Sequence, residues 1–193
     1  MNRVSSGATV ALAGATLAGL LLFAGGTGAA TTGAVGDDVK AGAPLPVISA
    51  TGDTVDLRAE LAPAPPAGKT RRGATLLVFW ATWCKPCMHE VPEIREVGRF
   101  YAPQGLRIVS VATTWKDDSL EKILGAAKDN GIDYEVLYDM KDSAREAFEV
   151  RSLPTTILID GRGVVTWRGN VLPADINERV RAALGPIEDS GAK

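Results

Sequence analysis

Cys84 and Cys87 are the only two cysteines of this 193-residue chain, and they are three positions apart. Both lie in the segment FWATWCKPCMHEVP, residues 79–92, with Lys85 and Pro86 between them. Two thiols at this spacing can form a stabilising disulfide, contribute to a metal site, or exchange electrons with another thiol or disulfide. The sequence around the pair distinguishes among these three uses.

The structural and metal interpretations are the weaker ones. A bridge between Cys84 and Cys87 closes a very short loop, so it gains only about 2 kcal/mol from restricting the unfolded chain. A structural zinc site needs four ligands, whereas this chain has one cysteine pair and one histidine, His89. His89 is two residues from Cys87, so in a helix it faces another side. Electron exchange is therefore favoured, with the structural bridge as its alternative and no metal expected.

The position of the pair in the predicted secondary structure supports electron exchange. The apolar run TLLVFWA, residues 75–81, predicts a buried strand, and apolar residues that recur every three positions predict a helix from Cys84 to Tyr101. A helix N-terminus offers free N–H groups and a partial positive charge to a thiolate, here that of Cys84. Lys85 adds a nearby cation. Pro92 lies inside this helix, where we expect a kink.

The rest of the pattern alternates between strands and helices. A Thr51-Gly52-Asp53 turn predicts a β-hairpin within residues 44–61. Further strands are predicted at 106–112, 134–139, 155–160 and 163–169, and further helices at 117–130, 142–149 and 173–184. This order predicts an α/β fold with a mainly parallel central sheet, which the last hairpin makes mixed.

The N-terminal region is a predicted targeting segment. No charged residue occurs from Val4 to Gly36, and residues 8–24 are small and apolar. We predict that residues 1–30 are a signal sequence or a membrane anchor, with small residues suited to cleavage near Ala29 or Ala30. Residues 31–43 then form a flexible tether, 44–186 the folded domain and 187–193 a disordered tail. The domain is accordingly expected outside the cytoplasm, secreted or anchored to the outer face of the cytoplasmic membrane, and in contact with the membrane only through the N-terminal segment.

The overall charge excludes one class of function. Lys and Arg together number 21 and Asp and Glu 23, which gives a net charge of −2. A nucleic-acid-binding domain normally shows a basic excess, so no nucleic-acid partner is expected.

Several segments together resemble the thioredoxin superfamily. FWATWCKPC is similar to its active-site segment, and CKPCMHEVP is similar to the Cys-x-Pro-Cys-x-x-Glu-x-Pro of the TlpA/ResA-like extracytoplasmic branch. SLPTTILID, residues 152–160, resembles the segment that carries the cis-proline of that fold. The N-terminal hairpin and the helix and strand of residues 117–138 match the additions found in this branch. The resemblance covers residues 44–184 and implies a thioredoxin-like fold.

The resemblance also implies roles for individual residues in a thiol-disulfide oxidoreductase. Cys84 is the exposed nucleophile, Cys87 resolves the mixed disulfide, and Glu90 is the general acid/base for the thiol proton. Pro154, in the cis form, keeps backbone hydrogen-bonding groups facing the cysteines and keeps stray metal out. The redox-active pair is the only reactive group implied, and no cofactor is expected.

Three neighbouring residues are expected to support this site. Pro86 shapes the turn between the cysteines, and Trp83 shields the active-site sulfur, whereas Trp80 is expected in the core. Cytoplasmic thioredoxins carry a buried aspartate six residues before the first cysteine, but this chain has Val78 there. The departure favours Glu90 as the proton-transfer group and a specialised enzyme rather than a broad disulfide reductase.

The sequence is compatible with either direction of electron flow. A reductase of the cytochrome c maturation type would keep protein thiols reduced, with apocytochrome c as a candidate substrate and a membrane thiol protein as electron donor. An oxidase would instead give its disulfide to folding secreted proteins. A third possibility is a non-catalytic copper-handling module on the same fold, for which His89 is poorly placed.

Overall fold

The computed structural model describes residues 38–39, 43–61, 73–114 and 118–186. Its elements follow one another in the order β1 Pro46–Ile48, β2 Thr54–Asp56, α1 Leu57–Glu60, β3 Ala74–Trp80, α2 Lys85–Tyr101, the 3₁₀ helix Ala102–Gln104, β4 Leu106–Thr113, α3 Leu120–Asp129, β5 Glu135–Asp139, α4 Ser143–Ala147, β6 Thr155–Ile159, β7 Val165–Gly169 and α5 Ile176–Leu184.

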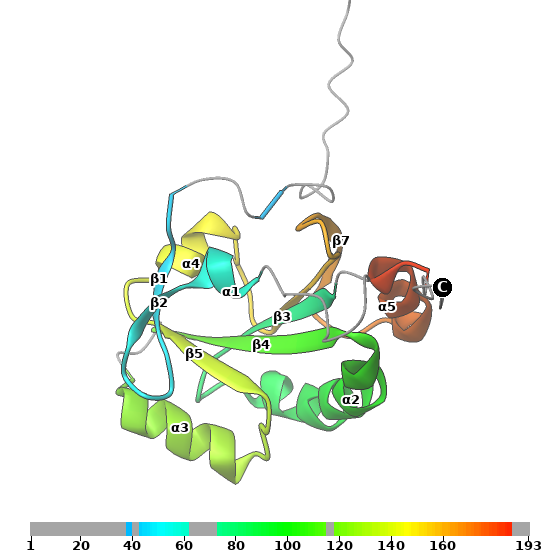
Figure 1. The fold of residues 1–193 in the computed structure, drawn as a ribbon. Coiled ribbons are helices and arrows are strands. Elements are labelled where there is room, and N and C mark those ends of the chain that lie inside the picture. Colours follow the sequence, from blue (N-terminus) through cyan, green and yellow to red (C-terminus); the bar gives the residue numbers. More distant parts are fainter. Residues whose placement is uncertain (1–37, 40–42, 62–72, 115–117, 187–193) are drawn as a thin grey trace, which may run out of the picture. The chain divides into compact units, whose positions relative to one another are not determined.

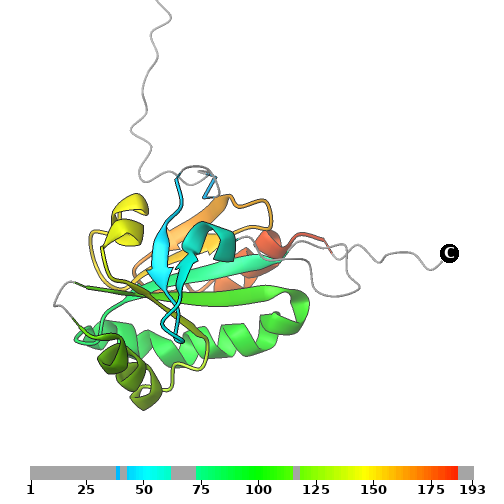
Figure 2. The ribbon, with the colours of Figure 1, turned by 60° about the vertical axis from the view of Figure 1, so that its left-hand side comes forward.

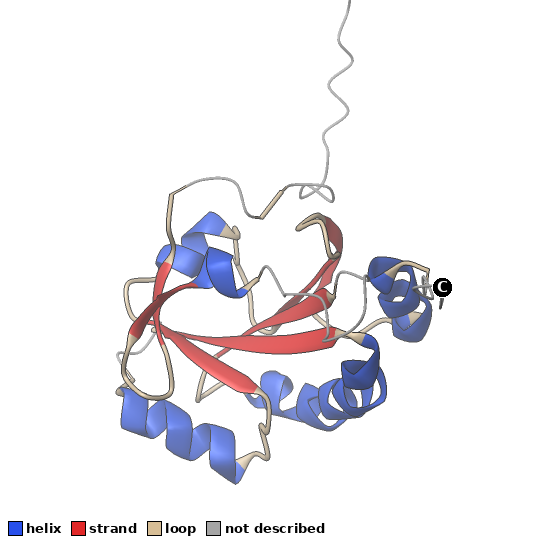
Figure 3. Ribbon diagram, in the orientation of Figure 1, coloured by secondary structure: helices blue, strands red, loops and turns tan. Residues whose placement is uncertain are grey.

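The strands form one mixed seven-stranded sheet, in the order β2-β1-β5-β4-β3-β6-β7 (Figures 1 and 3). The three central strands β5, β4 and β3 are parallel, whereas β6 pairs antiparallel with β3 and β7 antiparallel with β6. On the other side β1 pairs antiparallel with β5 and β2 antiparallel with β1. The predicted α/β fold with a mixed central sheet is therefore confirmed.

Helices cover both faces of this sheet (Figure 2). Alternate side chains of β3 enter opposite layers: Leu76 and Val78 pack with α2 and α5, and Leu77 and Phe79 pack with α1 and α4. All seven residues of β3 are buried, as its unbroken apolar run predicts for a strand covered on both sides. This fully buried strand leads directly into the cysteine segment and so fixes where that segment begins.

The predicted elements are present, with differences at their ends. Residues 44–61 contain the predicted hairpin of β1 and β2, followed by a one-turn helix, α1, that the pattern did not indicate. Predicted helix 117–130 begins at Leu120, because the Ser119 side chain accepts the backbone N–H of Lys122 and caps it. Helix α2 runs from Lys85 to Tyr101 and passes through Pro92.

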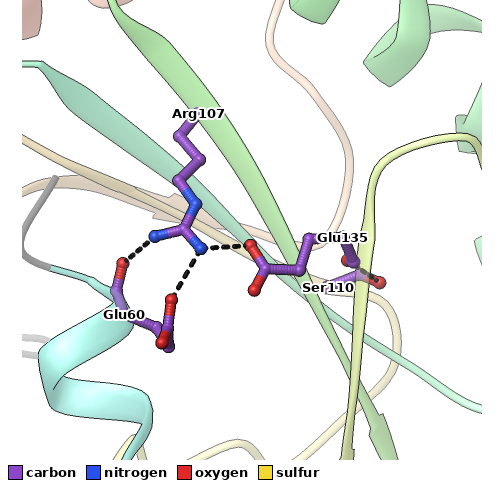
Figure 4. A network of polar contacts seen from close by, with 4 residues as sticks. All are labelled: Glu60, Arg107, Ser110 and Glu135. Carbon is purple, nitrogen blue, oxygen red and sulfur yellow. Dashed lines mark hydrogen bonds and ion pairs between the residues drawn. The ribbon is translucent and has the colours of Figure 1, made fainter. Parts of the chain in front are cut away.

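A half-buried ion cluster joins the N-terminal hairpin unit, which consists of β1, β2 and α1, to the central strands β4 and β5 (Figure 4). The Arg107 guanidinium on β4 donates to the backbone carbonyl of Glu60 and to its carboxylate, each at 2.6 Å. It also donates to the Glu135 carboxylate on β5 at 2.5 Å. Because these three residues come from α1, β4 and β5, their contacts connect elements that are far apart in the chain.

Most of the predicted N- and C-terminal segments lie outside the described residues. This holds for the predicted signal or anchor of residues 1–30, for most of the tether and for the tail of residues 187–193. Within residues 31–43, Asp38 forms a β-bridge with Val164, and Val39 is 5% exposed in the core. Among the described residues, none of the helices has both the length and the apolar character needed to cross a membrane.

Candidate active site

Cys84 and Cys87 form a disulfide at the start of α2. Their Cα atoms are 5.3 Å apart. The segment that carries them leaves the carboxyl end of β3, turns through a hydrogen bond from the Cys84 N–H to the Ala81 carbonyl at 3.0 Å, and enters the helix. The two sulfurs therefore lie at the edge of the sheet where the parallel strands end.

Cys84 caps the helix with its sulfur. The backbone N–H of Cys87 donates to Cys84 Sγ at 3.2 Å, and Cys84 is the N-cap residue of α2. Pro86 follows within the first turn, where its missing N–H costs no helical hydrogen bond. A helix of 17 residues aimed at this sulfur favours negative charge there. The arrangement is therefore suited to stabilise a thiolate at Cys84 once the disulfide opens.

One expectation about the pair is wrong for this disulfide state. The resemblance implies that Cys84 is exposed, but Cys84 is 3% exposed, as is Cys87. Both belong to a buried cluster with Trp80, Ile123 and Tyr138, from β3, α3 and β5. The covering side chains come from parts of the chain remote from the motif, which local spacing does not reveal.

The flanking residues divide between core and surface. Trp80 is 2% exposed and its indole N–H donates to the Ser110 hydroxyl at 3.3 Å, so its prediction as a core residue is confirmed. Trp83, expected to shield the sulfur, is 40% exposed. Lys85 and Pro86 are exposed, so the outer surface at the helix start carries a cation beside the disulfide.

Pro154 follows a cis peptide bond from Leu153, as the resemblance implies. The proline precedes β6, and Thr155 of β6 pairs with Phe79 near the end of β3. The cis segment is thus at the same edge of the sheet as the cysteines. Leu153 packs against the cluster that contains Cys84 and Cys87, and Pro154 itself is buried.

Glu90 is half-buried on α2 and its carboxylate has a defined partner. Glu90 Oε2 accepts the backbone N–H of Leu172 at 2.9 Å, across 82 positions of sequence. Leu172 lies in the same apolar cluster as Val78, which is 3% exposed. Val78 occupies the position where cytoplasmic thioredoxins carry a buried aspartate, and in this protein that position belongs to the apolar core.

Two further contacts at this edge were not indicated by the sequence. The Asn170 side chain donates to the Pro154 carbonyl and, at 2.8 Å, to the Ser152 hydroxyl, which ties the cis segment to the end of β7. The Thr82 hydroxyl donates to the carboxylate of Asp118. Both contacts join residues that are far apart in sequence, and no motif spacing marks them.

The described residues offer no obvious metal site. Within residues 38–39, 43–61, 73–114 and 118–186, no group of three or more His, Cys, Asp or Glu side chains is arranged to hold a metal ion. His89, the one histidine, is exposed on α2.

A fold of this topology with a cysteine pair between the first parallel strand and its helix is thioredoxin-like. A solved structure of the thioredoxin domain of a thiol-disulfide oxidoreductase from Bacteroides vulgatus superposes with a TM-score of 0.59 at 19% identity, over 80% of this chain and 98% of that one. A secreted disulfide oxidoreductase from Mycobacterium tuberculosis superposes with a TM-score of 0.57 at 18% identity, over 76% and 98% of the two chains.

The chain belongs to the AhpC/TSA family, whose model matches residues 67–168, more than half of the chain. It is also similar to curated thiol-disulfide oxidoreductases. The ResA protein of Geobacillus kaustophilus is 38% identical over 95 residues, which are 49% of this chain and 53% of that protein. The resemblance to ResA-like members of the thioredoxin superfamily is thereby confirmed, although the chain spans less than two thirds of the length of that relative.

Proposed function

We propose that this protein is an extracytoplasmic thiol-disulfide oxidoreductase that reduces disulfides of specific protein substrates through Cys84 and Cys87. The observation that carries the proposal is the Cys84–Cys87 disulfide. It lies at the N-terminus of α2, which Cys84 caps, and at the sheet edge that also holds the cis-Pro154 segment. Similarity to curated oxidoreductases supports it.

The reaction proceeds in two exchange steps. In the reduced protein the Cys84 thiolate attacks one sulfur of the substrate disulfide, which forms a mixed disulfide and releases the other substrate sulfur as a thiolate that takes up a proton. Cys87 then loses its proton and attacks Cys84 Sγ, which forms the intramolecular disulfide and releases the second substrate thiol. Two electrons and two protons pass from the protein to the substrate.

The roles of the two cysteines follow from their surroundings. Cys84 Sγ accepts the Cys87 N–H and lies at the positive end of α2, so Cys84 is the better thiolate. Glu90, three residues beyond Cys87, serves as the group that accepts the proton of Cys87 and returns it in the reverse direction. Leu153 packs against the cluster that holds the disulfide, and the cis segment that it forms with Pro154 is the part of the chain that would present backbone groups to the substrate.

The substrate and the electron donor are part of the same proposal. Reduction of another protein's disulfide leaves this protein oxidised, so a dithiol donor must restore it. We assign that role to a membrane thiol protein. The proposed substrates are disulfides formed between the cysteine thiols of apocytochrome c or of a similar extracytoplasmic protein, which the reaction returns to the dithiol state. An oxidase would use the same residues in reverse, and the measured reduction potential separates the two directions.

Trapping of mixed disulfides tests the chemistry. Cys87→Ser leaves the first step intact and blocks the second, so the purified full-length variant should accumulate a mixed disulfide with a disulfide-containing protein, detected on non-reducing gels. Cys84→Ser should accumulate none. In the reduced Cys87→Ser protein, Cys84 should react readily with iodoacetamide. Equal trapping by both variants, or a Cys84 thiol inert to alkylation, would refute the assignment of roles.

A further inference from the structure

Asp118 is a buried carboxylate at the edge of the sheet where the parallel strands end. The residue is 4% exposed and its side chain 2% exposed. One carboxylate oxygen accepts the Thr82 hydroxyl, and the other pairs with the Lys122 ammonium group. The Asp118 carbonyl accepts the hydroxyl of Tyr138 at 2.7 Å. Asp118 therefore links the segment after β3 with α3 and β5.

The link reaches the chain immediately before the nucleophile. Thr82 lies inside the turn that the Cys84 N–H closes on the Ala81 carbonyl at 3.0 Å. Between the fixed hydroxyl of Thr82 and Cys84 there is one residue, Trp83. Tyr138, which holds the Asp118 backbone, is 5% exposed and packs in the same buried cluster as Cys84 and Cys87.

The hydrogen bond to the buried Asp118 carboxylate holds the Thr82 side chain in place. A buried carboxylate is costly unless charge or hydrogen bonds compensate it. Here one oxygen is compensated by a cation whose side chain is 63% exposed and the other by Thr82. Because charge-assisted hydrogen bonds are stronger than neutral ones, a hydroxyl held by such a carboxylate is well fixed.

We propose that Asp118, acting through Thr82, is a positioning residue for the Cys84–Cys87 redox pair. It restricts the turn before Cys84 and so raises the effective concentration of one thiol at the other when the disulfide closes. The inference deepens the proposed oxidoreductase function and rests on it.

The equilibrium with glutathione measures this effect directly. The protein disulfide and two molecules of reduced glutathione give the protein dithiol and one molecule of glutathione disulfide, with two electrons passing to the protein. Loss of the anchor lowers the tendency of the disulfide to close. Thr82→Val, which removes the hydroxyl and leaves the Asp118–Lys122 pair in place, should therefore shift the equilibrium toward the dithiol by about fivefold, in line with one hydrogen bond.

Matched variants separate positioning from general stability. Thr82→Ser keeps the hydroxyl and should return the equilibrium constant to within about twofold of the wild type. Thr51→Val also removes a hydroxyl that donates to a carboxylate, that of Asp53 at 2.6 Å, but in the exposed β1–β2 turn away from the cysteines, and should leave the equilibrium unchanged. Asp118→Ala should shift it in the same direction as Thr82→Val, and the double variant should add little to the larger single effect.

The outcomes are distinguishable from a failure of the proposed function. A wild-type protein that does not exchange with glutathione would refute the oxidoreductase activity and this inference with it. A wild type that exchanges, together with a Thr82→Val variant whose melting temperature falls but whose equilibrium constant matches the wild type and Thr51→Val, would refute the positioning role alone. If Asp118→Ala does not fold, the equilibrium constants of Thr82→Val and Thr82→Ser still test the positioning role, because equal constants for these two variants would refute it.

Discussion

The Glu90 side chain combines a hydrogen bond with a charge, and substitutions can separate the two. Its carboxylate accepts the Leu172 N–H at 2.9 Å. Glu90→Gln keeps a carbonyl oxygen for that bond but cannot accept the Cys87 proton. We expect Gln to slow thiol-disulfide exchange by about 10²-fold and to flatten its pH dependence. This is the low end of the usual contribution of a general acid/base group, because a thiol needs less help with its proton than an alcohol does. Stopped-flow rates across pH with a small disulfide measure both effects.

Glu90→Ala is the companion variant, because it also removes the bond to Leu172. It should lose about 1–2 kcal/mol of unfolding free energy, whereas Gln keeps an acceptor for the Leu172 N–H, so it should lose less than Ala and stay within about 1 kcal/mol of the wild type. An exchange rate and pH profile unchanged in Glu90→Gln would leave Glu90 with the structural role alone.

The sequence predicted residues that belong to a contiguous motif and missed those that act through distant partners. Cys84 and Cys87 are paired as the spacing suggests, and Pro154 is cis as the resemblance implies. The Glu90–Leu172 and Thr82–Asp118 contacts depend on which loops meet at one sheet edge. That information is in the three-dimensional fold rather than in any local pattern.

The turn between β6 and β7 contains a carboxylate that makes its stability depend on pH. Burial by itself raises the pKa of Asp160, but the backbone N–H groups of Val164 and Arg162 and the Arg162 guanidinium outweigh it and hold that pKa below the ordinary value. A lowered pKa in the folded state means that Asp160 stabilises the fold above the unfolded-state pKa of about 3.9, and that this stabilisation is lost as the pH falls through the folded-state value.

Asp160→Asn should therefore destabilise the protein by about 1 kcal/mol at neutral pH, because it removes the charge and one acceptor for Arg162. The difference from the wild type should shrink once the pH falls below about 4, where the wild-type carboxylate also becomes neutral. Urea unfolding of both proteins at several pH values measures this. A difference that stays constant into the acid range would show that the charge of Asp160 contributes nothing.

Arg107 attaches the hairpin unit to the central strands, because it connects α1, β4 and β5 through two glutamates (Figure 4). Its side chain is 35% exposed, so solvent weakens but does not cancel these interactions. Arg107→Met keeps the apolar part of the side chain and removes the forked guanidinium group. It should lower the free energy of unfolding, measured with urea, by about 1–2 kcal/mol. Arg107→Lys should fall between, because an ammonium group cannot reproduce the fork.

The exposed Arg179–Asp175 pair on α5 provides the control, since Arg179→Met should leave the unfolding transition unchanged. Equal effects of the two substitutions would contradict the proposed role of Arg107.

The sequence predicted strands and helices well where the pattern of buried apolar residues determines the type of element. The run at 75–81 became β3 because both faces of that strand are covered. Helix ends were predicted less well, because a capping side chain such as Ser119 determines where α3 begins. The one-turn helix α1 was missed, since four residues show no full period and its hydrogen bonds involve Asp56 and the β1 segment.

The cellular location proposed for the molecule depends on the uncharged N-terminal run. Fractionation of the native host should place the protein in the membrane or outside it, with the thioredoxin-like domain open to protease added from the outer side. The physical reason is that an apolar segment of this length directs a chain into or across a membrane. Recovery of the full-length chain from the cytosol would contradict the proposed location.

The reduction potential of the Cys84–Cys87 couple tests the central proposal, a reductase, most directly. A reductase must hold its electrons less tightly than its substrate does, so its potential must be low, whereas an oxidase needs a high one. Equilibration of the full-length protein with defined glutathione or dithiothreitol ratios, followed by thiol alkylation, gives the value. We predict a potential near that of thioredoxin, roughly −270 mV; a value near −120 mV would contradict the reductase and assign the protein to the oxidases.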